Sequence, residues 1–102
     1  MTDHNRWTWD ETKASANRVK HKVSFLLAMR VFQDPLHLTV PDPYEHEERW
    51  RTFGYVQQIL IIVVHTEPEF NGDSLVRQGR IISARKATTH ERKAFEENTH
   101  GC

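Results

Sequence analysis

The stretch RWRTFGYVQQILIIVVH, residues 49–65, decides the fold class. Its first half, residues 49–56, alternates in polarity and is rich in β-favouring residues, which is typical of a strand with one buried face. Its second half, residues 59–65, is the most apolar segment of the chain and is predicted to be the central strand of a sheet. Because only Gln57 and Gln58 separate the two halves, we expect an antiparallel hairpin.

Two further strands are predicted outside this hairpin. Residues 36–40 form a short apolar segment that ends at the Pro41-Asp42-Pro43 break. Residues 79–85 form the last strand, after a predicted loop over 67–74 that contains Asn71-Gly72. Since the connections between the strands are short, we expect a four-stranded antiparallel meander.

Three helices are predicted, each preceded by a residue that commonly caps helix N-termini. The first covers Glu11–His21 behind Asp10, and the second begins after Ser24 and ends before Pro35. The third opens with a capping box over residues 88–91. The expected fold is a single α+β domain over residues 1–102, with two N-terminal helices, the four-stranded sheet and a C-terminal helix. If the helices cover one face of the sheet, the other face is open for a site.

The charges of the chain are segregated although its formal net charge is zero. Residues 77–93 contain six lysines and arginines and a single acid, Glu91, whereas acids gather in residues 42–48 and 67–73. A neutral chain is not typical of a protein that coats nucleic acid. The segregation nevertheless permits a local phosphate-binding surface.

Several classes of protein are excluded by composition. The apolar run over residues 59–64 is too short to span a bilayer, and no leader-like segment opens the chain, so we expect a cytoplasmic protein. The single cysteine, Cys102, excludes a disulfide framework. The histidines lack metal-ligand spacing, and we therefore expect neither a metal nor another cofactor.

The strand over residues 49–56 carries the first candidate site. Alternation places Arg49, Arg51, Phe53 and Tyr55 on one face. The planar fork of arginine binds phosphate in a bidentate way and can stabilise negative charge that develops on it. Aromatic rings among cations are typical of single-stranded RNA recognition. The alternative is that the arginines form a solvated surface and the rings belong to the core.

Neighbouring strands add further candidates. Arg80 and Arg85 are expected to point to opposite faces unless a bulge intervenes, so that at most one joins the arginines of residues 49–56. His65 and Glu67 form a candidate acid–base pair, or else His65 merely caps a neighbouring carbonyl. Glu48 is a candidate salt-bridge partner of an arginine.

The segment RIISARKAT, residues 80–88, with Glu91-Arg92 and Phe95 after it, resembles the BrnT toxin family. Other matching segments follow in order along nearly the whole chain: Trp9-Asp10, Val23-Ser24-Phe25, Glu48-Arg49 with Gly54, and Val64-His65-Thr66-Glu67. The resemblance implies a RelE-like fold and a ribonuclease toxin of a type II toxin–antitoxin system. Such a toxin cleaves RNA, inhibits translation and growth, and is neutralised by a ribbon-helix-helix antitoxin called BrnA.

With this resemblance, the candidate residues fall into two groups. The catalytic candidates are Arg85, Arg49, Arg80, His65 and Glu67, and the RNA-binding candidates are Arg51, Tyr55, Lys86 and Arg92. The expected partners are the BrnA-like antitoxin, the RNA substrate, and operator DNA reached only through the antitoxin, with no membrane contact. Two features depart from the family: Phe95 replaces a frequent tyrosine, and the connection over residues 67–80 is longer than usual.

Two alternatives to an enzyme remain open from the sequence. The first is a non-catalytic nucleic-acid-binding or corepressor module that acts with a DNA-binding partner and uses its arginines only to hold phosphates. The second is a structural domain without a substrate.

Overall fold

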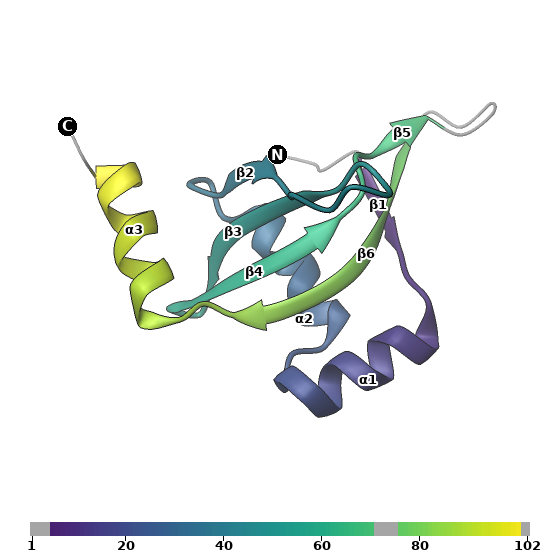
Figure 1. The fold of residues 1–102 in the computed structure, drawn as a ribbon, viewed down its shortest axis with the longest axis horizontal. Helices are drawn as coiled ribbons and strands as arrows, with labels where there is room; N and C mark the ends of the chain where they lie inside the picture. The colour runs from purple at the N-terminus through teal and green to yellow at the C-terminus, as the bar shows by residue number, and fades with distance from the viewer. Residues whose placement is uncertain (1–4, 71–75, 101–102) are drawn as a thin grey trace.

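The computed structural model of the chain describes residues 5–70 and 76–100 (Figure 1). Its elements are, in order, β1 (Asn5–Thr8), α1 (Glu11–His21), α2 (Phe25–Met29), the 3₁₀ helix η1 (Arg30–Gln33), β2 (Leu38–Pro41), β3 (Trp50–Val56), β4 (Ile59–His65), β5 (Glu69–Phe70), β6 (Arg77–Lys86) and α3 (Thr89–His100). The α+β class is confirmed. The predictions made for Asn71-Gly72 and Cys102 lie outside the described residues.

The sheet has six strands in the order β1-β6-β4-β3-β2, with β5 also paired to β6. The predicted antiparallel meander of β2, β3, β4 and β6 is confirmed. The predicted total of four strands was wrong, because β6 begins at Arg77 and extends beyond the end of β4. The backbone of this extension hydrogen-bonds to β1, which runs parallel to it, and to β5, which lies within the predicted loop over residues 67–74.

The β3–β4 hairpin turns through two residues in the left-handed region, Gln57 at φ 51° and Gln58 at φ 72°. Two positive φ angles in a two-residue connection are the geometry of the type I′ hairpin turn, which matches the twist of the strands. Glutamine adopts this region at a cost of about 1–2 kcal/mol per residue. The pairing of the two strands along their whole length therefore holds the turn in place.

One face of the sheet is covered by α1, α2 and η1 (Figure 1). The core lies beneath them, and its most buried apolar residues are Val23, Phe25, Ala28, Val31, Ile61, Val63, Ile81 and Ala84. The predicted second helix over residues 24–34 is in fact α2 followed by η1. At η1 the backbone comes so close to β3 that a Cβ atom on Gly54 would lie 2.8 Å from the Val31 carbonyl oxygen, which explains the glycine there.

Asn17 ties α1 to both the following turn and β6. Its Nδ2 donates to the carbonyls of Val23 and Ala84, at 2.9 and 2.8 Å, and its Oδ1 accepts from the Ala84 backbone nitrogen at 3.1 Å. The side chain is only 7% exposed. Asn17 therefore satisfies three main-chain groups that are buried away from water.

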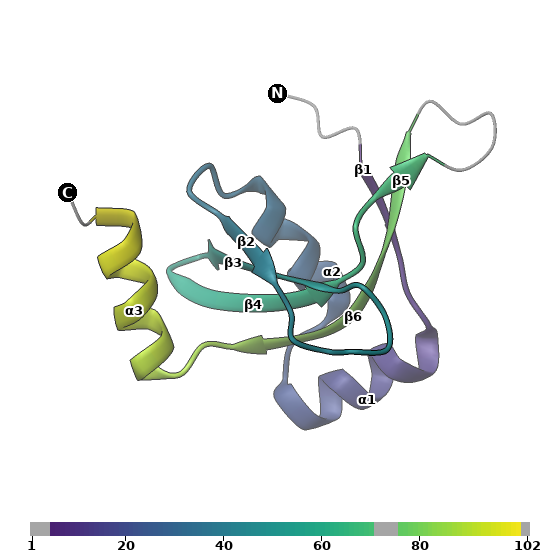
Figure 2. The same cartoon turned by 45° about the horizontal axis from the view of Figure 1, so that its top comes forward.

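The last helix, α3, packs against the end of the opposite face of the sheet, at the β3–β4 turn (Figure 2). The predicted capping box is confirmed, because the Glu91 backbone nitrogen donates to Thr88 Oγ1 at 3.1 Å and the Thr88 backbone nitrogen donates to Glu91 Oε1 at 2.9 Å. Phe95 is buried and lies against the rings of Phe53 and Tyr55. The face that we expected to be open is therefore covered at one end by α3. Within the described chain, no helix is long and apolar enough to cross a membrane.

Candidate functional site

A β-bulge in β6 turns Arg80 and Arg85 toward the same face of the sheet. His65 of β4 pairs with Ile81, but the preceding residue, Val64, pairs with Ser83, so Ile82 is an extra residue in the ladder. This insertion reverses the alternation between the two arginines. The bulge that the sequence analysis allowed as an exception is therefore present, and both arginines join those of β3 on one face.

The face that both arginines share is the one opposite α1 and α2. On β3, Arg51, Phe53 and Tyr55 are half-buried on this face, whereas Thr52 and the other alternate residues are buried beneath the helices. The predicted alternation along β3 is confirmed, and Arg49 directly precedes the strand. We call this the open face.

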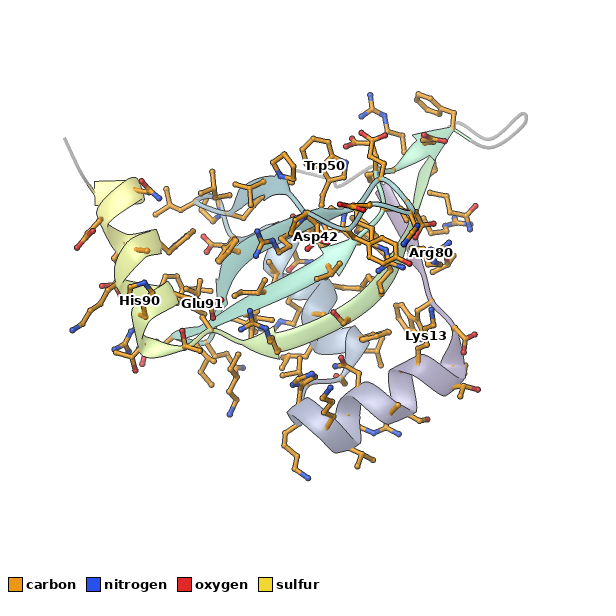
Figure 3. The ribbon with its side chains drawn as sticks, viewed as in Figure 1. Lys13, Asp42, Trp50, Arg80, His90 and Glu91 are labelled. Atoms are coloured by element: carbon orange, nitrogen blue, oxygen red, sulfur yellow. The ribbon has the colours of Figure 1, made fainter. Side chains whose placement is uncertain are left out.

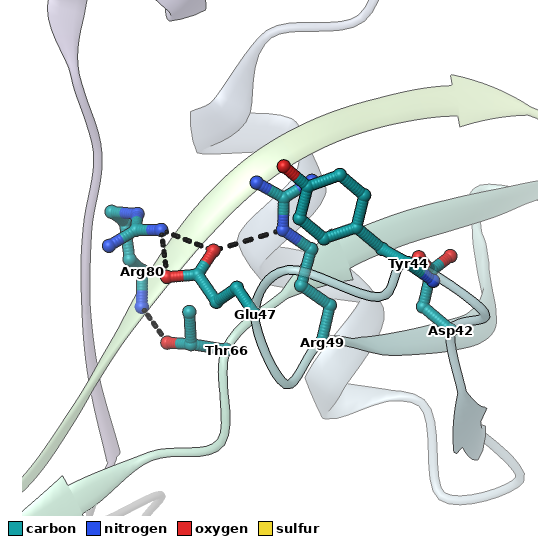
Figure 4. A network of polar contacts seen from close by, with 6 residues as sticks. All are labelled: Asp42, Tyr44, Glu47, Arg49, Thr66 and Arg80. Carbon is teal, nitrogen blue, oxygen red and sulfur yellow. Dashed lines mark hydrogen bonds and ion pairs between the residues drawn. The ribbon is translucent and has the colours of Figure 1, made fainter.

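At one end of the open face, four side chains form what we call the loop cluster, made of Tyr44, Glu47, Arg49 and Arg80 (Figure 4). Glu47 accepts hydrogen bonds from Arg49 Nε at 3.0 Å and from the Nη2 atom of Arg80 at 2.9 and 2.8 Å. The Arg49 guanidinium carbon lies 3.9 Å from the centre of the Tyr44 ring. The hydrogen bonds from Arg80 and then from Arg49 lower the pKa of Glu47, so this carboxylate stays ionised at neutral pH.

The loop over residues 42–49, which joins β2 to β3, carries three of these four residues. Asp42 fixes the start of this loop, since its Oδ2 accepts from the Tyr44 backbone nitrogen at 3.1 Å and its Oδ1 lies 3.4 Å from Arg51 Nε. Through Glu47 the loop reaches β6, two strands away from β3.

At the other end of the open face, side chains of β6, β3 and α3 form what we call the helix cluster. It is made of Arg85, Glu91, Tyr55 and Glu96. Arg85 donates from both terminal nitrogens to the two carboxylate oxygens of Glu91, each at 2.8 Å. This fork and the Thr88 backbone lower the pKa of Glu91 to about 2. Tyr55 donates its hydroxyl to Glu96 Oε1 at 2.9 Å, and burial followed by this hydrogen bond raises the pKa of Tyr55.

The two clusters lie at opposite ends of β6, as the positions of Arg80 and Glu91 show in Figure 3. Arg80 and Arg85 are five positions apart along β6, which corresponds to roughly 15 Å. The two arginines are therefore too far apart to bind one and the same phosphate group. Lys86 pairs with Ile61 and so alternates to the helix-covered side, whereas Arg92 is exposed on α3 and lies 4.0 Å from Glu96.

The model of a known protein family matches residues 9–91, a span that contains both clusters except for Glu96. That family comprises the BrnT ribonuclease toxins of type II toxin–antitoxin systems. The chain belongs to the BrnT family. As a member of a type II system, it has an antitoxin as its partner. No curated protein matches the chain.

His65, one of the two acid–base candidates, lies on the covered side of the sheet of this BrnT chain. It is 3% exposed, and its ring packs edge-on against Trp7 and Phe32 at 5.0 and 5.1 Å between ring centres. Its Nδ1 donates to the Thr66 carbonyl at 2.8 Å, so Nε2 is left to accept from Thr52 Oγ1 at 2.6 Å. The structure therefore favours the carbonyl-capping alternative for His65.

Glu67, the other acid–base candidate, is exposed and lies beyond the end of β4. The expected strand alternation does not extend to it, because β4 ends at His65. The structure thus brings Arg49 and Arg80 together at one end of the open face and places Arg85 on the same face. His65 lies on the covered side of the sheet, away from all three arginines. Among the described residues, no three histidine, cysteine, aspartate or glutamate side chains gather as a metal site would require.

The buried neutral histidine predicts a pH dependence of stability. Burial lowers the pKa of His65, so the unfolded chain binds its proton more readily than the native protein does. The free energy of unfolding is expected to be greatest above about pH 6.5 and to fall below that pH by up to about 1.4 kcal/mol per pH unit. Urea titrations between pH 5 and 8 measure this slope. His65→Gln should flatten it and the exposed-site control His90→Gln should not; equal slopes in both variants would contradict this account.

Glu47 is the part of the site that the sequence analysis missed. Glu48 was the predicted salt-bridge partner of an arginine, but Glu48 is exposed and Glu47 makes the contacts. Glu47 lies in the loop before β3, where strand alternation does not apply, so no periodic signal in the sequence distinguishes it from Glu48.

Proposed function

We propose that this BrnT toxin is a metal-independent endoribonuclease in which Arg49, Arg80 and Arg85 hold the RNA backbone. The bulge in β6 carries this proposal, since it places both β6 arginines on the face that bears Arg51 and Tyr55. Guanidinium forks bind phosphate in a bidentate way and remain charged at any physiological pH.

The chemistry assigned to these arginines is charge stabilisation. The ribose 2′-hydroxyl gives up its proton to water as its oxygen attacks the adjacent phosphorus, and the 5′-oxygen takes up a proton from water as its bond to phosphorus breaks, so that a 2′,3′-cyclic phosphate and a 5′-hydroxyl result. The phosphorane formed on the way carries additional negative charge, which prepositioned cations stabilise without a metal ion. We place this phosphorane at the loop cluster, where Arg49 and Arg80 converge on Glu47, and a phosphate farther along the same RNA strand at Arg85.

Of the remaining candidate residues, some are assigned to RNA binding and the others are left out of the proposal. Arg51, which lies beside Asp42 of the loop over residues 42–49, and Tyr55, which belongs to the helix cluster, are assigned to RNA binding. Arg92 extends the cationic surface along α3. Lys86 is left out because it alternates to the other side. His65 and Glu67 are left out as an acid–base pair because the ring of His65 is in the core.

We infer the cellular role from the same site. Cleavage of RNA by the toxin would inhibit translation and growth in the cytoplasm, and the fold would be of the RelE kind. A BrnA-like ribbon-helix-helix antitoxin would neutralise the toxin by covering the cationic open face with an acidic or amphipathic segment. The toxin would reach operator DNA only through that antitoxin.

Induced expression of the toxin without its antitoxin tests this function. We expect growth to stop and transcripts to be shortened, and co-expression of the antitoxin to restore both. Normal growth with intact transcripts, in cells that contain the folded toxin, would contradict the proposal.

A second candidate, the non-catalytic corepressor module, is favoured by two observations. The loop and helix clusters already pair their arginines with carboxylates, and position 95 is a phenylalanine rather than a tyrosine. Arg85→Ala separates the two candidates. Loss of toxicity with retained antitoxin binding supports the enzyme, whereas toxicity that does not depend on Arg85 supports the binding module.

A further inference from the structure

We propose that Glu47 is a positioning residue, which holds Arg49 and Arg80 as a fixed pair of cations for the phosphorane. The inference rests on the proposed ribonuclease function and concerns a residue to which that function assigns no role. Glu47 itself contacts no substrate in this account. It acts through the two guanidinium groups.

The contacts of Glu47 join elements that are far apart in sequence. Arg49 lies at the end of the loop over residues 42–49, and Arg80 lies on β6, yet Glu47 Oε1 accepts from both, at 3.0 and 2.9 Å. The second oxygen, Oε2, accepts from Arg80 again, at 2.8 Å. One carboxylate therefore sets the separation of the two guanidinium groups.

Most donors of the two arginines remain available in this arrangement. A guanidinium carries five N–H donors. Arg49 uses only Nε toward Glu47, and Arg80 uses only Nη2. No acceptor among residues 5–70 and 76–100 takes up the other guanidinium N–H groups of this pair. Glu47 thus orients the two forks without filling them.

The two arginines differ in how firmly other groups hold them. The Arg49 side chain is 19% exposed and lies on the Tyr44 ring, so it has a second support. The Arg80 side chain is 43% exposed, and Glu47 is the only side chain of the described residues with which its guanidinium pairs. Without Glu47 we expect Arg80 to sample many rotamers, which loses the preorganisation that catalysis needs.

An alternative role for Glu47, competition with RNA for the two arginines, predicts the opposite change in kcat when Glu47 is removed. If the carboxylate merely competed with RNA for the two forks, its removal would free both cations and raise activity. If it positions them, its removal lowers kcat although the site becomes more positive. The direction of the change in kcat therefore decides between the two roles.

The test compares Glu47→Gln with Glu48→Gln, which removes the same charge from the neighbouring residue, an exposed one. Both are assayed on a short RNA with a single cleavage site, at fixed salt, and binding is measured with the same RNA carrying a 2′-O-methyl group at that site. For Glu47→Gln we expect kcat to fall by about 10–100-fold, with unchanged or tighter binding of the methylated RNA. For Glu48→Gln we expect the kcat of the wild type. A Glu47→Gln protein with equal or higher kcat overturns the inference.

A second comparison excludes a general structural effect. In an Arg49→Ala/Arg80→Ala background, adding Glu47→Gln should cause no further loss of kcat, because Glu47 acts only through these arginines. A further loss of tenfold or more overturns the inference. If Glu47→Gln does not fold, Glu47→Asp replaces it, and a kcat equal to that of the wild type then overturns the inference. A folded wild type that cleaves no RNA contradicts the proposed function itself, whereas an active wild type with an unaffected Glu47→Gln contradicts only the role of Glu47.

Discussion

Replacing Arg85 with alanine is expected to lower kcat/KM for RNA cleavage by about 10–100-fold. Arg85 offers a bidentate, charge-assisted contact to a phosphate of the bound RNA, and a hydrogen bond to a charged group contributes about 1.5–3 kcal/mol, which corresponds to about 10–100-fold in kcat/KM. The present partner of the fork, Glu91 at 2.8 Å, shows that its geometry suits two oxygen atoms side by side. Initial rates on a single-site RNA at several substrate concentrations measure the effect.

Two control variants and a check of folding accompany this prediction. Arg85→Lys keeps the charge but loses the fork, so we expect an intermediate rate. Arg77→Ala removes an exposed arginine from the same strand and should leave the rate within about twofold of the wild type. The Arg85–Glu91 side chains are 37% and 25% exposed, and pairs of this kind add at most about 1 kcal/mol to stability, so Arg85→Ala should remain folded. A folded Arg85→Ala protein with wild-type kcat/KM would remove Arg85 from the site.

The largest effect on stability is expected at Asn17. Asn17→Ala leaves the Ala84 backbone nitrogen and two carbonyls, those of Val23 and Ala84, without their partners in a buried place. Since each unsatisfied buried group costs about 1–3 kcal/mol, the free energy of unfolding should fall by about 3 kcal/mol or more. For a domain of this size the corresponding fall in Tm is more than about 10 °C.

The matched control for this change is Asn98→Ala, on the exposed side of α3. An exposed substitution of this kind should change the free energy of unfolding by less than about 0.5 kcal/mol. Thermal and urea unfolding of both variants compare the two sites. If Asn17→Ala lowers Tm by no more than Asn98→Ala does, then water replaces the amide and the account of Asn17 as a tie between α1 and β6 is wrong.

The elements of the fold that were predicted correctly are those whose formation depends on residues close to them in the sequence. Glu11–His21 has the bounds predicted from Asp10, because an N-cap acts through the next few residues. The β3–β4 hairpin follows from two complementary strands and a connection of two residues. In contrast, β1 and β5 exist because β6 extends past β4 and its backbone groups need partners. No pattern within their own short segments indicates this.

The site was predictable to the extent that strand alternation is regular. Alternation gave the correct face for Arg51, Phe53 and Tyr55, but it failed for Arg80 and Arg85 because of the extra residue, Ile82. The two consecutive isoleucines, followed by Ser83, break period two and were the available sign of a bulge.

No comparable pattern in the sequence indicates which face of β4 carries His65. All six residues that precede it, residues 59–64, are apolar, so the pattern does not distinguish the two faces of β4. Only the pairing of His65 with Trp50 and Ile81 assigns it to the covered side.

The central claim is that the toxin cleaves RNA without a metal ion, and that the arginines of the open face stabilise the negative charge of the phosphorane. Its most direct test is cleavage of a defined RNA by the purified wild-type toxin, free of antitoxin, in the presence of EDTA. The account predicts cleavage at an undiminished rate, with products that end in a 2′,3′-cyclic phosphate and begin with a 5′-hydroxyl. Cleavage that stops in EDTA and returns with added Mg²⁺, or the absence of any cleavage by folded protein in either condition, would contradict it.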